Sequence, residues 1–179
     1  NGTILKTSDG GINWESESSE TNHNLKSVFF RNTMSGWTVG TGGIILNRGT
    51  DWNIQTIGGN AQNLISVYFT DANTGWAVGN VGTILKTING GTSWNSQNSG
   101  TENLLTSICL INDVTGWTAG NNGTILKTND GTNWYQLESG TTLDLKSIYF
   151  TNSNTGWVVG RFGTILKTTD GGESWTSQS

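Results

Sequence analysis

The charged side chains of this sequence offer two arrangements that could do chemistry. The chain has three arginines, Arg31, Arg48 and Arg161, which is the number that a sialidase uses to clamp the carboxylate of its substrate. Glu15 and Glu17 stand two residues apart, so on a strand their side chains would share a face about 6.6–6.8 Å apart along the chain. That spacing is close to the separation of the two carboxylates in inverting glycosidases. Both arrangements require the side chains to meet in one pocket.

The sequence has one histidine, His23, and one cysteine, Cys109. A nucleophilic thiol needs a base in contact with it, and a zinc site needs three or four ligands. His23 lies in a polar segment, whereas Cys109 takes the place of an aromatic residue in an apolar run. We therefore expect Cys109 to be a small core residue, and we expect no catalytic residue, no metal and no cofactor.

Three Gly-x-x-Gly segments could resemble phosphate-binding loops. A phosphate-binding loop opens a helix, whereas these segments join two expected strands, so we predict tight turns. The last segment carries Arg161 and Phe162 where the others carry Asn or Val. A cation and an aromatic ring at the tip of a turn suit a binding surface. The predicted ligand-binding residues are Arg161, Phe162, Asn121, Asn122, Asn80 and His23.

Tryptophans divide the chain into repeats of about 40 residues. One set of four, each after a glycine, has spacings of 39, 41 and 40 residues, and a second set of five has spacings of 38, 42, 40 and 41. The first set is Trp37, Trp76, Trp117 and Trp157, and the second is Trp14, Trp52, Trp94, Trp134 and Trp175. We expect these rings to fill the spaces between repeated units.

Each repeat contains four short runs of β-branched and aromatic residues, which we letter A to D, bounded by Gly, Asn or Asp. No 3.6-residue apolar period lasts long enough for a helix. Strand A is expected at Leu25–Phe30, Leu64–Phe69, Leu105–Leu110 and Leu145–Phe150, and strand B at Gly36–Gly40, Gly75–Gly79, Gly116–Gly120 and Gly156–Gly160. Strand C is expected at Gly2–Thr7, Gly43–Arg48, Gly82–Thr87, Gly123–Thr128 and Gly163–Thr168. Strand D begins near each tryptophan of the second set. The fold class is therefore all-β, a β-propeller of four-stranded antiparallel blades.

Strand order places the arginines apart. In an antiparallel blade the A–B and C–D loops lie at one end, the C–D rim, and the B–C and D–A loops at the other, the B–C rim. Arg31 and Arg48 belong to the C–D rim and Arg161 to the B–C rim, so they cannot clamp one ligand. Glu15 and Glu17 lie on the outer strand, where charge protects an exposed edge. We predict that the chain is not an enzyme.

A recurring turn between strands C and D is the most specific motif. It reads Thr7-Ser8-Asp9-Gly10-Gly11-Ile12-Asn13-Trp14 and resembles the Asp box of sialidase-like and sortilin-like propellers. A short Asp or Asn side chain accepts hydrogen bonds from turn amides, and the tryptophan fixes the turn. We assign a structural role rather than catalysis or calcium binding, since one carboxylate per turn is too few for calcium. The assigned residues are Asp9, Asn89, Asp130, Asp170, Trp14, Trp94, Trp134 and Trp175.

The whole repeat, with its Leu-x-Ser-Val/Ile-x-Phe, Thr-Gly-Trp and Gly-Thr-Ile-Leu-Lys-Thr segments, resembles the propeller family of photosystem II stability and assembly factors. The resemblance covers nearly all of the chain, although Arg48-Gly49-Thr50-Asp51-Trp52 is too short for the same turn. It implies protein binding during the assembly of a complex. The photosynthetic members carry an arginine-rich surface, which three arginines cannot supply. Relatives in secreted bacterial proteins imply an extracellular, cell-surface or periplasmic location.

The D–A loops vary most between repeats, and variable loops on a rigid scaffold commonly carry function. These loops are Ser18–Asn24, Gly58–Asn63, Ser99–Asn103 and Gly140–Asp144. We predict a non-catalytic interaction module that binds a protein or a carbohydrate on the B–C rim. A lectin with repeated sugar sites between blades is one alternative, and a structural accessory domain of a larger secreted protein is another.

Charge and length set further bounds. The net charge is −4 without a basic stripe, which argues against nucleic acid as a partner, and no run of about 18 apolar residues is present for membrane insertion. The repeats span about 1–18, 24–62, 63–103, 104–143 and 144–179 of a single propeller domain. They make four full blades and a leading half-blade, five blade positions in all. We expect the chain to be part of a larger ring, and its oligomeric state stays open.

Overall fold

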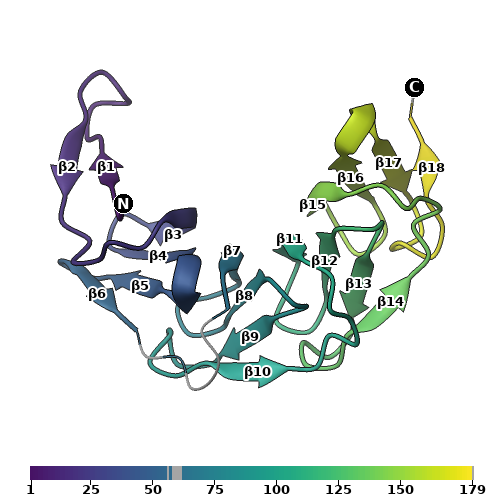
Figure 1. Ribbon diagram of the computed structural model, residues 1–179, viewed down its shortest axis with the longest axis horizontal. Coiled ribbons are helices and arrows are strands. Elements are labelled where there is room, and N and C mark those ends of the chain that lie inside the picture. Colours follow the sequence, from purple (N-terminus) through teal and green to yellow (C-terminus); the bar gives the residue numbers. More distant parts are fainter. Residues whose placement is uncertain (56, 58–61, 179) are drawn as a thin grey trace.

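The computed structural model describes residues 1–55, 57 and 62–178. Five antiparallel sheets follow one another along an open arc, with the two chain ends in its first and last sheets (Figure 1). Four sheets have four strands in chain order and the first has two. The prediction of an all-β propeller with four full blades and a leading half-blade is confirmed. Among the described residues, none forms a helix with the length and apolar character that a membrane crossing requires.

The strands are short because glycine-rich turns interrupt them every few residues. The leading sheet consists of β1 (Ile4–Lys6) and β2 (Glu15–Glu17). The second blade is β3 (Leu25–Asn32), β4 (Ser35–Gly40), β5 (Ile45–Arg48) and β6 (Trp52–Ile54), and the third is β7 (Leu64–Phe69), β8 (Gly75–Gly79), β9 (Ile84–Thr87) and β10 (Asn95–Gln97). The fourth is β11 (Leu105–Leu110), β12 (Gly116–Gly120), β13 (Ile125–Thr128) and β14 (Tyr135–Leu137). The fifth is β15 (Leu145–Phe150), β16 (Gly156–Gly160), β17 (Ile165–Thr168) and β18 (Thr176–Ser177).

The C strands begin two residues later than predicted, at the isoleucine of Gly-Thr-Ile-Leu-Lys-Thr. The preceding glycine has a left-handed backbone, with φ of +59° at Gly82 and +68° at Gly123, and so belongs to the turn. The following threonine also belongs to the turn, because the Thr83 hydroxyl donates to the carbonyl of Asn80 at 2.7 Å. Two of these turns are short 3-10 helices, η1 (Thr41–Gly43) and η2 (Arg161–Gly163), which were not predicted.

The core consists of layers between neighbouring blades. Trp37 of β4 stacks on Phe69 of β7 in the next blade with ring centroids 3.6 Å apart, and Trp117 of β12 stacks on Phe150 of β15 at the same distance. The indole N–H of each ring donates to a turn carbonyl of that next blade, Gly90 at 3.0 Å and Gly171 at 2.9 Å. The second and fourth blades therefore stabilise the C–D turn of the blade that follows them, and Trp76 of the third blade does the same by donating to Gly131 at 3.2 Å.

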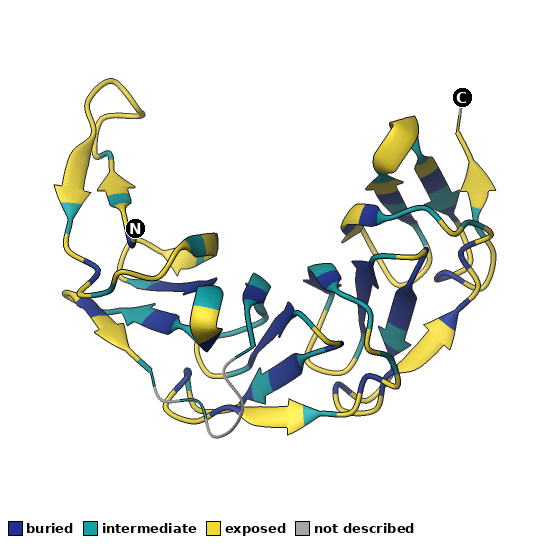
Figure 2. Cartoon of the chain, in the orientation of Figure 1, coloured by how far each residue is buried: buried dark blue, intermediate teal, exposed yellow. Residues whose placement is uncertain are grey.

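Burial falls from the middle of the arc to its first sheet. Figure 2 shows the inner strands of the middle blades as buried, whereas β1 and β2 are exposed or intermediate. The face of β3 that looks toward this first sheet is also open, with Val28 and Phe30 about half exposed. The first blade position therefore lacks the cover that the middle blades have.

Candidate functional site

The B–C and D–A loops of each blade meet on one rim, as strand order predicts. Their backbones are joined directly, by Asn80 N to the carbonyl of Asn63, Asn121 N to Leu104 and Arg161 N to Asp144, each at 2.9 Å. These bonds repeat from blade to blade, so they provide a rigid base. The side chains at the loop tips are free to differ on this base.

On the last two blades the tips form a connected group, which we call the rim cluster: Asn121, Asn122, Asp144, Lys146, Arg161 and Phe162. Its centre is the carboxylate of Asp144. Lys146 Nζ lies 3.3 Å and Arg161 Nε 3.4 Å from Asp144 Oδ2. The backbone N–H of Asn122 donates to Asp144 Oδ1 at 3.3 Å, and this bond, with the two cations, lowers the pKa of Asp144. Two cations face one carboxylate, so the cluster keeps a net positive charge.

The two asparagines extend the cluster, Asn121 toward the fifth blade and Asn122 toward the loop that precedes the fourth. Lys146 Nζ donates to Asn121 Oδ1 at 3.2 Å, and Asn122 Nδ2 donates to Asn103 Oδ1 at 3.0 Å. Amide groups that already carry these bonds still present free lone pairs and N–H groups to solvent. The cluster can therefore exchange hydrogen bonds with a polypeptide or a sugar.

Phe162 is the most exposed large apolar residue of the described chain, with 87% of its surface accessible. Its backbone is left-handed, with φ of +55°, a conformation that is uncommon for a bulky residue. Val81 and Asn122 have the same conformation at the equivalent tips, with φ of +52° and +54°. The turn therefore fixes the tip residue outward, and in the last blade it holds an aromatic ring in water.

The structure does not bring all the predicted binding residues together. Asn80 lies at the tip of the third blade, one blade away from the cluster. His23 lies between β2 and β3, toward the other end of the arc, where its imidazole covers the backbone of Gly42 so closely that a Cβ there would lie 2.5 Å from His23 Cε1. The predicted variable loop Gly58–Asn63 falls largely outside the described residues. Only four of the six predicted residues share one site.

The sequence analysis missed Asp144 and Lys146, although they are the charged centre of the cluster. The equivalents of Asp144 at the start of the other A strands are Asn24, Asn63 and Leu104, so a charge at this position occurs once. Strand A begins opposite the end of strand B, with Leu145 paired to Gly160. That register could have predicted contact between Asp144 and Arg161.

The C–D turns use their acidic residues for internal hydrogen bonds. The Ser174 hydroxyl donates to Asp170 Oδ2, while Asp170 Oδ1 accepts the Ser174 backbone N–H at 3.0 Å and the Thr168 hydroxyl at 2.7 Å. These bonds hold the pKa of the Asp170 carboxyl well below the ordinary value. The same bonds to Asn13 and Thr7 lower the pKa of Asp9 to about 2. Asn89 makes the equivalent bonds in the third blade as a neutral amide. The acidic and amide side chains of these turns therefore act as hydrogen-bond acceptors within the turn.

The other candidate groups are each engaged separately. Arg31 donates to the carbonyl of Thr70 at 2.7 Å, while Arg48 pairs with Glu17, far from Arg161. Glu17 Oε1 also lies 3.6 Å from Lys6 Nζ. Cys109 is a separate case, a buried residue whose burial raises the pKa of its thiol. In the described part of the chain, no three His, Cys, Asp or Glu side chains group as a metal site.

The sequence matches the family described as Photosynthesis system II assembly factor YCF48 over residues 47–146 and 132–179. A comparison with curated proteins gave no match. Among solved structures, "YCF48 from Cyanidioschyzon merolae" is 18% identical with a TM-score of 0.75, covering 98% of this chain and 66% of that one. "YCF48 bound to D1 peptide" is 23% identical with a TM-score of 0.58, covering 64% of this chain and 40% of that one.

An ancestral GH74 enzyme also shares the fold, at 17% identity and a TM-score of 0.67, over 86% of this chain and 24% of that one. At such identities the three structures show the propeller architecture alone. The chain spans less than two thirds of the length of each of them.

The expectation of an extracellular, cell-surface or periplasmic location is wrong. It rested on relatives in secreted proteins, whereas the match is to assembly factors of a photosystem, which is built inside the cell. The repeat itself is common to both groups of proteins, and the sequence of a blade contains no targeting signal. Location could therefore not be read from the repeat.

Proposed function

The chain belongs to the Photosynthesis system II assembly factor YCF48 family, and from this premise we propose that it is a non-catalytic propeller that binds a segment of another protein through the B–C rim. The observation that carries the proposal is the rim cluster, where one turn presents the exposed ring of Phe162 and the adjacent residue Arg161. Aromatic and arginine side chains are the residues that contribute most to protein interfaces.

The chemistry of the cluster indicates the kind of segment it would bind. Arg161 and Lys146 share one carboxylate, so a second carboxylate from a partner would be attracted. Phe162 would cover an apolar side chain next to that carboxylate, and the asparagines would bond to its backbone. A relative bound to a D1 peptide supports a polypeptide as the ligand.

The absence of catalysis is part of the same proposal. The candidate carboxylate Glu17 is occupied by Arg48 and Lys6, and the turn aspartates are held in the ionised form by the hydrogen bonds around them. A general acid requires a raised pKa and a place beside substrate. The shared fold of the GH74 enzyme supplies neither.

The test replaces the tip of the B–C turn in the fifth blade with the sequence of the equivalent tip in the fourth blade. The double variant Arg161→Asn with Phe162→Asn reproduces the Gly-Asn-Asn-Gly tip of the fourth blade, so the turn should fold unchanged. With the D1 peptide as the probe in a calorimetric titration, we expect the affinity to fall about tenfold or more. The matched control, Arg31→Ala with Ile88→Ala, removes an arginine and an exposed apolar side chain from the C–D rim and should leave the affinity unchanged.

Two outcomes would contradict the proposal. If the Asn-Asn variant and the wild type bind the D1 peptide with equal affinity, the binding site does not include Arg161 and Phe162. A glycan titration showing several equivalent sugar sites, with no binding of the peptide, would favour the lectin alternative.

A further inference from the structure

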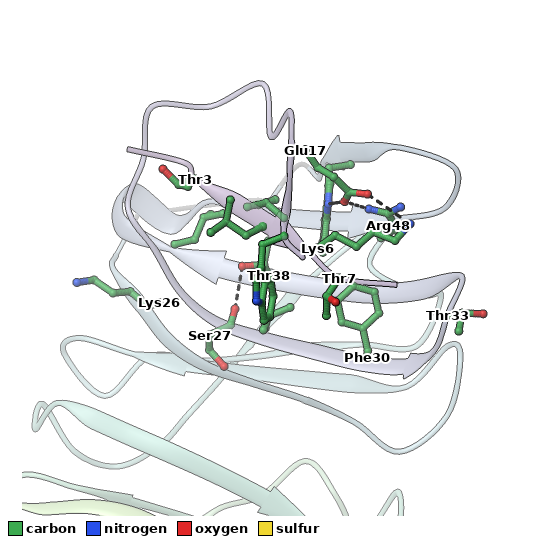
Figure 3. Close-up of a pocket in the computed structure, with 16 residues that line it drawn as sticks. Thr3, Lys6, Thr7, Glu17, Lys26, Ser27, Phe30, Thr33, Thr38 and Arg48 are labelled. Atoms are coloured by element: carbon green, nitrogen blue, oxygen red, sulfur yellow. Dashed lines mark hydrogen bonds and ion pairs between the residues drawn. The ribbon is translucent and has the colours of Figure 1, made fainter. Parts of the chain in front are cut away.

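The first blade position contains an open groove between β1 and the second blade, with a volume of about 520 Å³ (Figure 3). Its walls come from β1, β3 and the end of β5, including Leu5, Lys6, Val28, Phe30 and Arg48. β1 is hydrogen-bonded to β2 on one side only, so its other edge presents backbone N–H and C=O groups without a strand partner. Such an edge is a template for an added strand.

The groove walls are apolar at positions that every other blade buries. Val28 is 59% exposed, whereas its equivalents Val67, Ile108 and Ile148 are 4%, 5% and 4% exposed. In those three places the cover is the B strand of the preceding blade. The same interface therefore occurs three times in a filled form and once with one partner missing.

Lys6 shows what lies opposite β1 in a filled position. In the third, fourth and fifth blades the lysine of strand C stands over the tryptophan of strand B, with Nζ 4.9, 5.8 and 5.5 Å from the ring centroid. The register places this pair directly across the two strands, as Trp76 with Lys86. Lys6 is in the same register position of β1, and in the part of the chain that the structure describes its one ion pair is with Glu17. It therefore marks the place of a missing tryptophan.

Trp14 marks the second missing ring. In the second, third and fifth blades an aromatic residue of strand A meets the strand D tryptophan edge to face, at 5.8, 5.8 and 6.0 Å. Trp94 is 4% exposed in this arrangement, but Trp14 is 58% exposed. No such phenylalanine meets Trp14 among the described residues.

We propose that this groove binds a β-hairpin with the repeat's own A–B pattern, Leu-x-Ser-Val/Ile-x-Phe followed by Gly-Trp-x-x-Gly. Its B strand pairs antiparallel with β1, with its tryptophan over Lys6 and its glycine opposite Thr7. Its A strand brings the phenylalanine against Trp14, and its B strand covers Val28 and Phe30. The hairpin is specified by four separate features of the groove: a free strand edge, a lysine, a tryptophan and an apolar wall.

A second copy of the chain does not fit as the occupant. Each described A–B pair, β3–β4, β7–β8, β11–β12 and β15–β16, already forms the inner half of its own blade. Removing one of them to fill a neighbour's groove would open an equal groove in the donor. The occupant is therefore an additional hairpin of this pattern.

The decisive experiment grafts a copy of residues 144–161 directly in front of Asn1. The junction then reads Gly-Arg-Asn-Gly, which reproduces the Gly-x-x-Gly connection between strands B and C of the other blades. We expect a higher Tm than that of the parent chain and strong protection of the Leu5 and Lys6 amides from hydrogen exchange. A matched graft, in which the copies of Phe150 and Trp157 are alanine, should give neither effect.

A binding measurement separates docking from a general effect of the extension. A dye-labelled peptide with the sequence of residues 144–161 should bind the parent chain, and Val28→Asp should weaken that binding about tenfold or more because a charge enters the apolar wall. Val114→Asp, an exposed valine away from the groove, is the control and should bind as the parent does. Unprotected Leu5 and Lys6 amides in the graft would overturn the proposal, as would a concentration-dependent dimer of the parent chain that protects the same amides.

Discussion

At the residue scale, the C–D turns depend on a side-chain acceptor rather than on a charge. Asn89 occupies the place of the aspartates and receives the backbone N–H of Ser93 at 2.9 Å. We therefore expect Asp170→Asn to lower Tm only slightly, while Asp170→Ala lowers it clearly because Ser174 and Thr168 lose their acceptor. Thermal unfolding followed by circular dichroism measures both variants. Equal losses would show that the charge itself matters.

The acid side of the stability curve gives the second residue-scale prediction. The pKa values of Asp9, Asp130 and Asp170 lie below the ordinary value in the folded chain, so their contribution to stability is complete above the unfolded pKa near 3.8. It is lost as the pH falls through the folded pKa, which for Asp9 is about 2. Replacing all three by Asn should flatten the fall of the urea midpoint between pH 4 and 2. An unchanged slope would assign that fall to other carboxylates.

Residue types predicted some contacts and missed others for a physical reason. The turn residues act within eight positions of one another, so their roles follow from local sequence. Asp144 and Lys146 at the start of strand A meet Arg161 after strand B, and their contact depends on strand register. Such contacts were open to prediction only once the strands were aligned.

At the element scale, one ion pair joins the leading sheet to the second blade. Glu17 of β2 pairs with Arg48 of β5, whose side chain is 10% exposed, and accepts the indole N–H of Trp52 at 3.1 Å. Gln97 of β10 in the third blade accepts from Trp134 of the fourth blade in the same way, at 2.8 Å. Arg48, the last residue of β5, therefore connects the shortened C–D turn of the second blade to the leading sheet, a contact that the sequence analysis did not predict.

Removing the charge of Glu17 should show how much this ion pair contributes to the free energy of unfolding. Glu17→Gln keeps the acceptor for Trp52 but leaves the largely buried Arg48 side chain without a counter-charge, so we expect a loss of about 1–3 kcal/mol in the free energy of unfolding. Glu15→Gln, on the same strand but exposed, is the control and should change it by less than about 0.5 kcal/mol. Denaturant titrations measure the free energy of unfolding of each variant. Adding Arg48→Met to Glu17→Gln should recover part of the lost free energy of unfolding, because the unpaired charge is removed. A double variant that is less stable than Glu17→Gln alone would contradict this explanation.

The stacked tryptophans give a prediction about the contacts between blades. Trp117→Phe keeps a ring against Phe150 and loses the bond to Gly171, so it should cost about 1–2 kcal/mol of unfolding free energy. Trp117→Ala should cost about 3–5 kcal/mol. Trp157→Phe is the control, since its indole donates to no group in the part of the chain that the structure describes. If Trp157→Phe lowers the free energy of unfolding as much as Trp117→Phe does, the loss in Trp117→Phe does not come from the hydrogen bond between blades.

The strands were the best-predicted elements, because period-two runs between glycines repeat several times in one chain. Three A strands and three B strands have the predicted bounds, and the others of these types are extended by one or two residues. The early start assigned to the C strands came from counting Gly-Thr as strand. The left-handed φ of those glycines depends on the bond between the B–C and D–A loops, which a local pattern does not contain.

At the scale of the whole molecule, the arc predicts a gradient of stability. Each blade contacts only its neighbours, so stability is the sum of blade terms and nearest-neighbour contacts. The third and fourth blades are covered on both faces. The first sheet has one neighbour, and at the other end Val159 and Ile165 are 42% exposed where their equivalents are buried. Opening should therefore begin at both ends and reach the middle last.

Hydrogen exchange followed by mass spectrometry measures this gradient directly. Peptides covering β11–β13 should exchange at least about tenfold more slowly than those covering β1–β2 or β17–β18, because exchange from the ends needs only local opening. In the chain with the added A–B hairpin, β1–β2 should approach the protection of the middle blades while β17–β18 stays unchanged. Uniform protection along the parent chain would mean that the arc unfolds as one unit, and the contacts between blades would then be stronger than the open ends suggest. A gradient that rises from one end only would show that the two exposed faces are unequal, so that one of them already has enough internal contacts to hold without a neighbour.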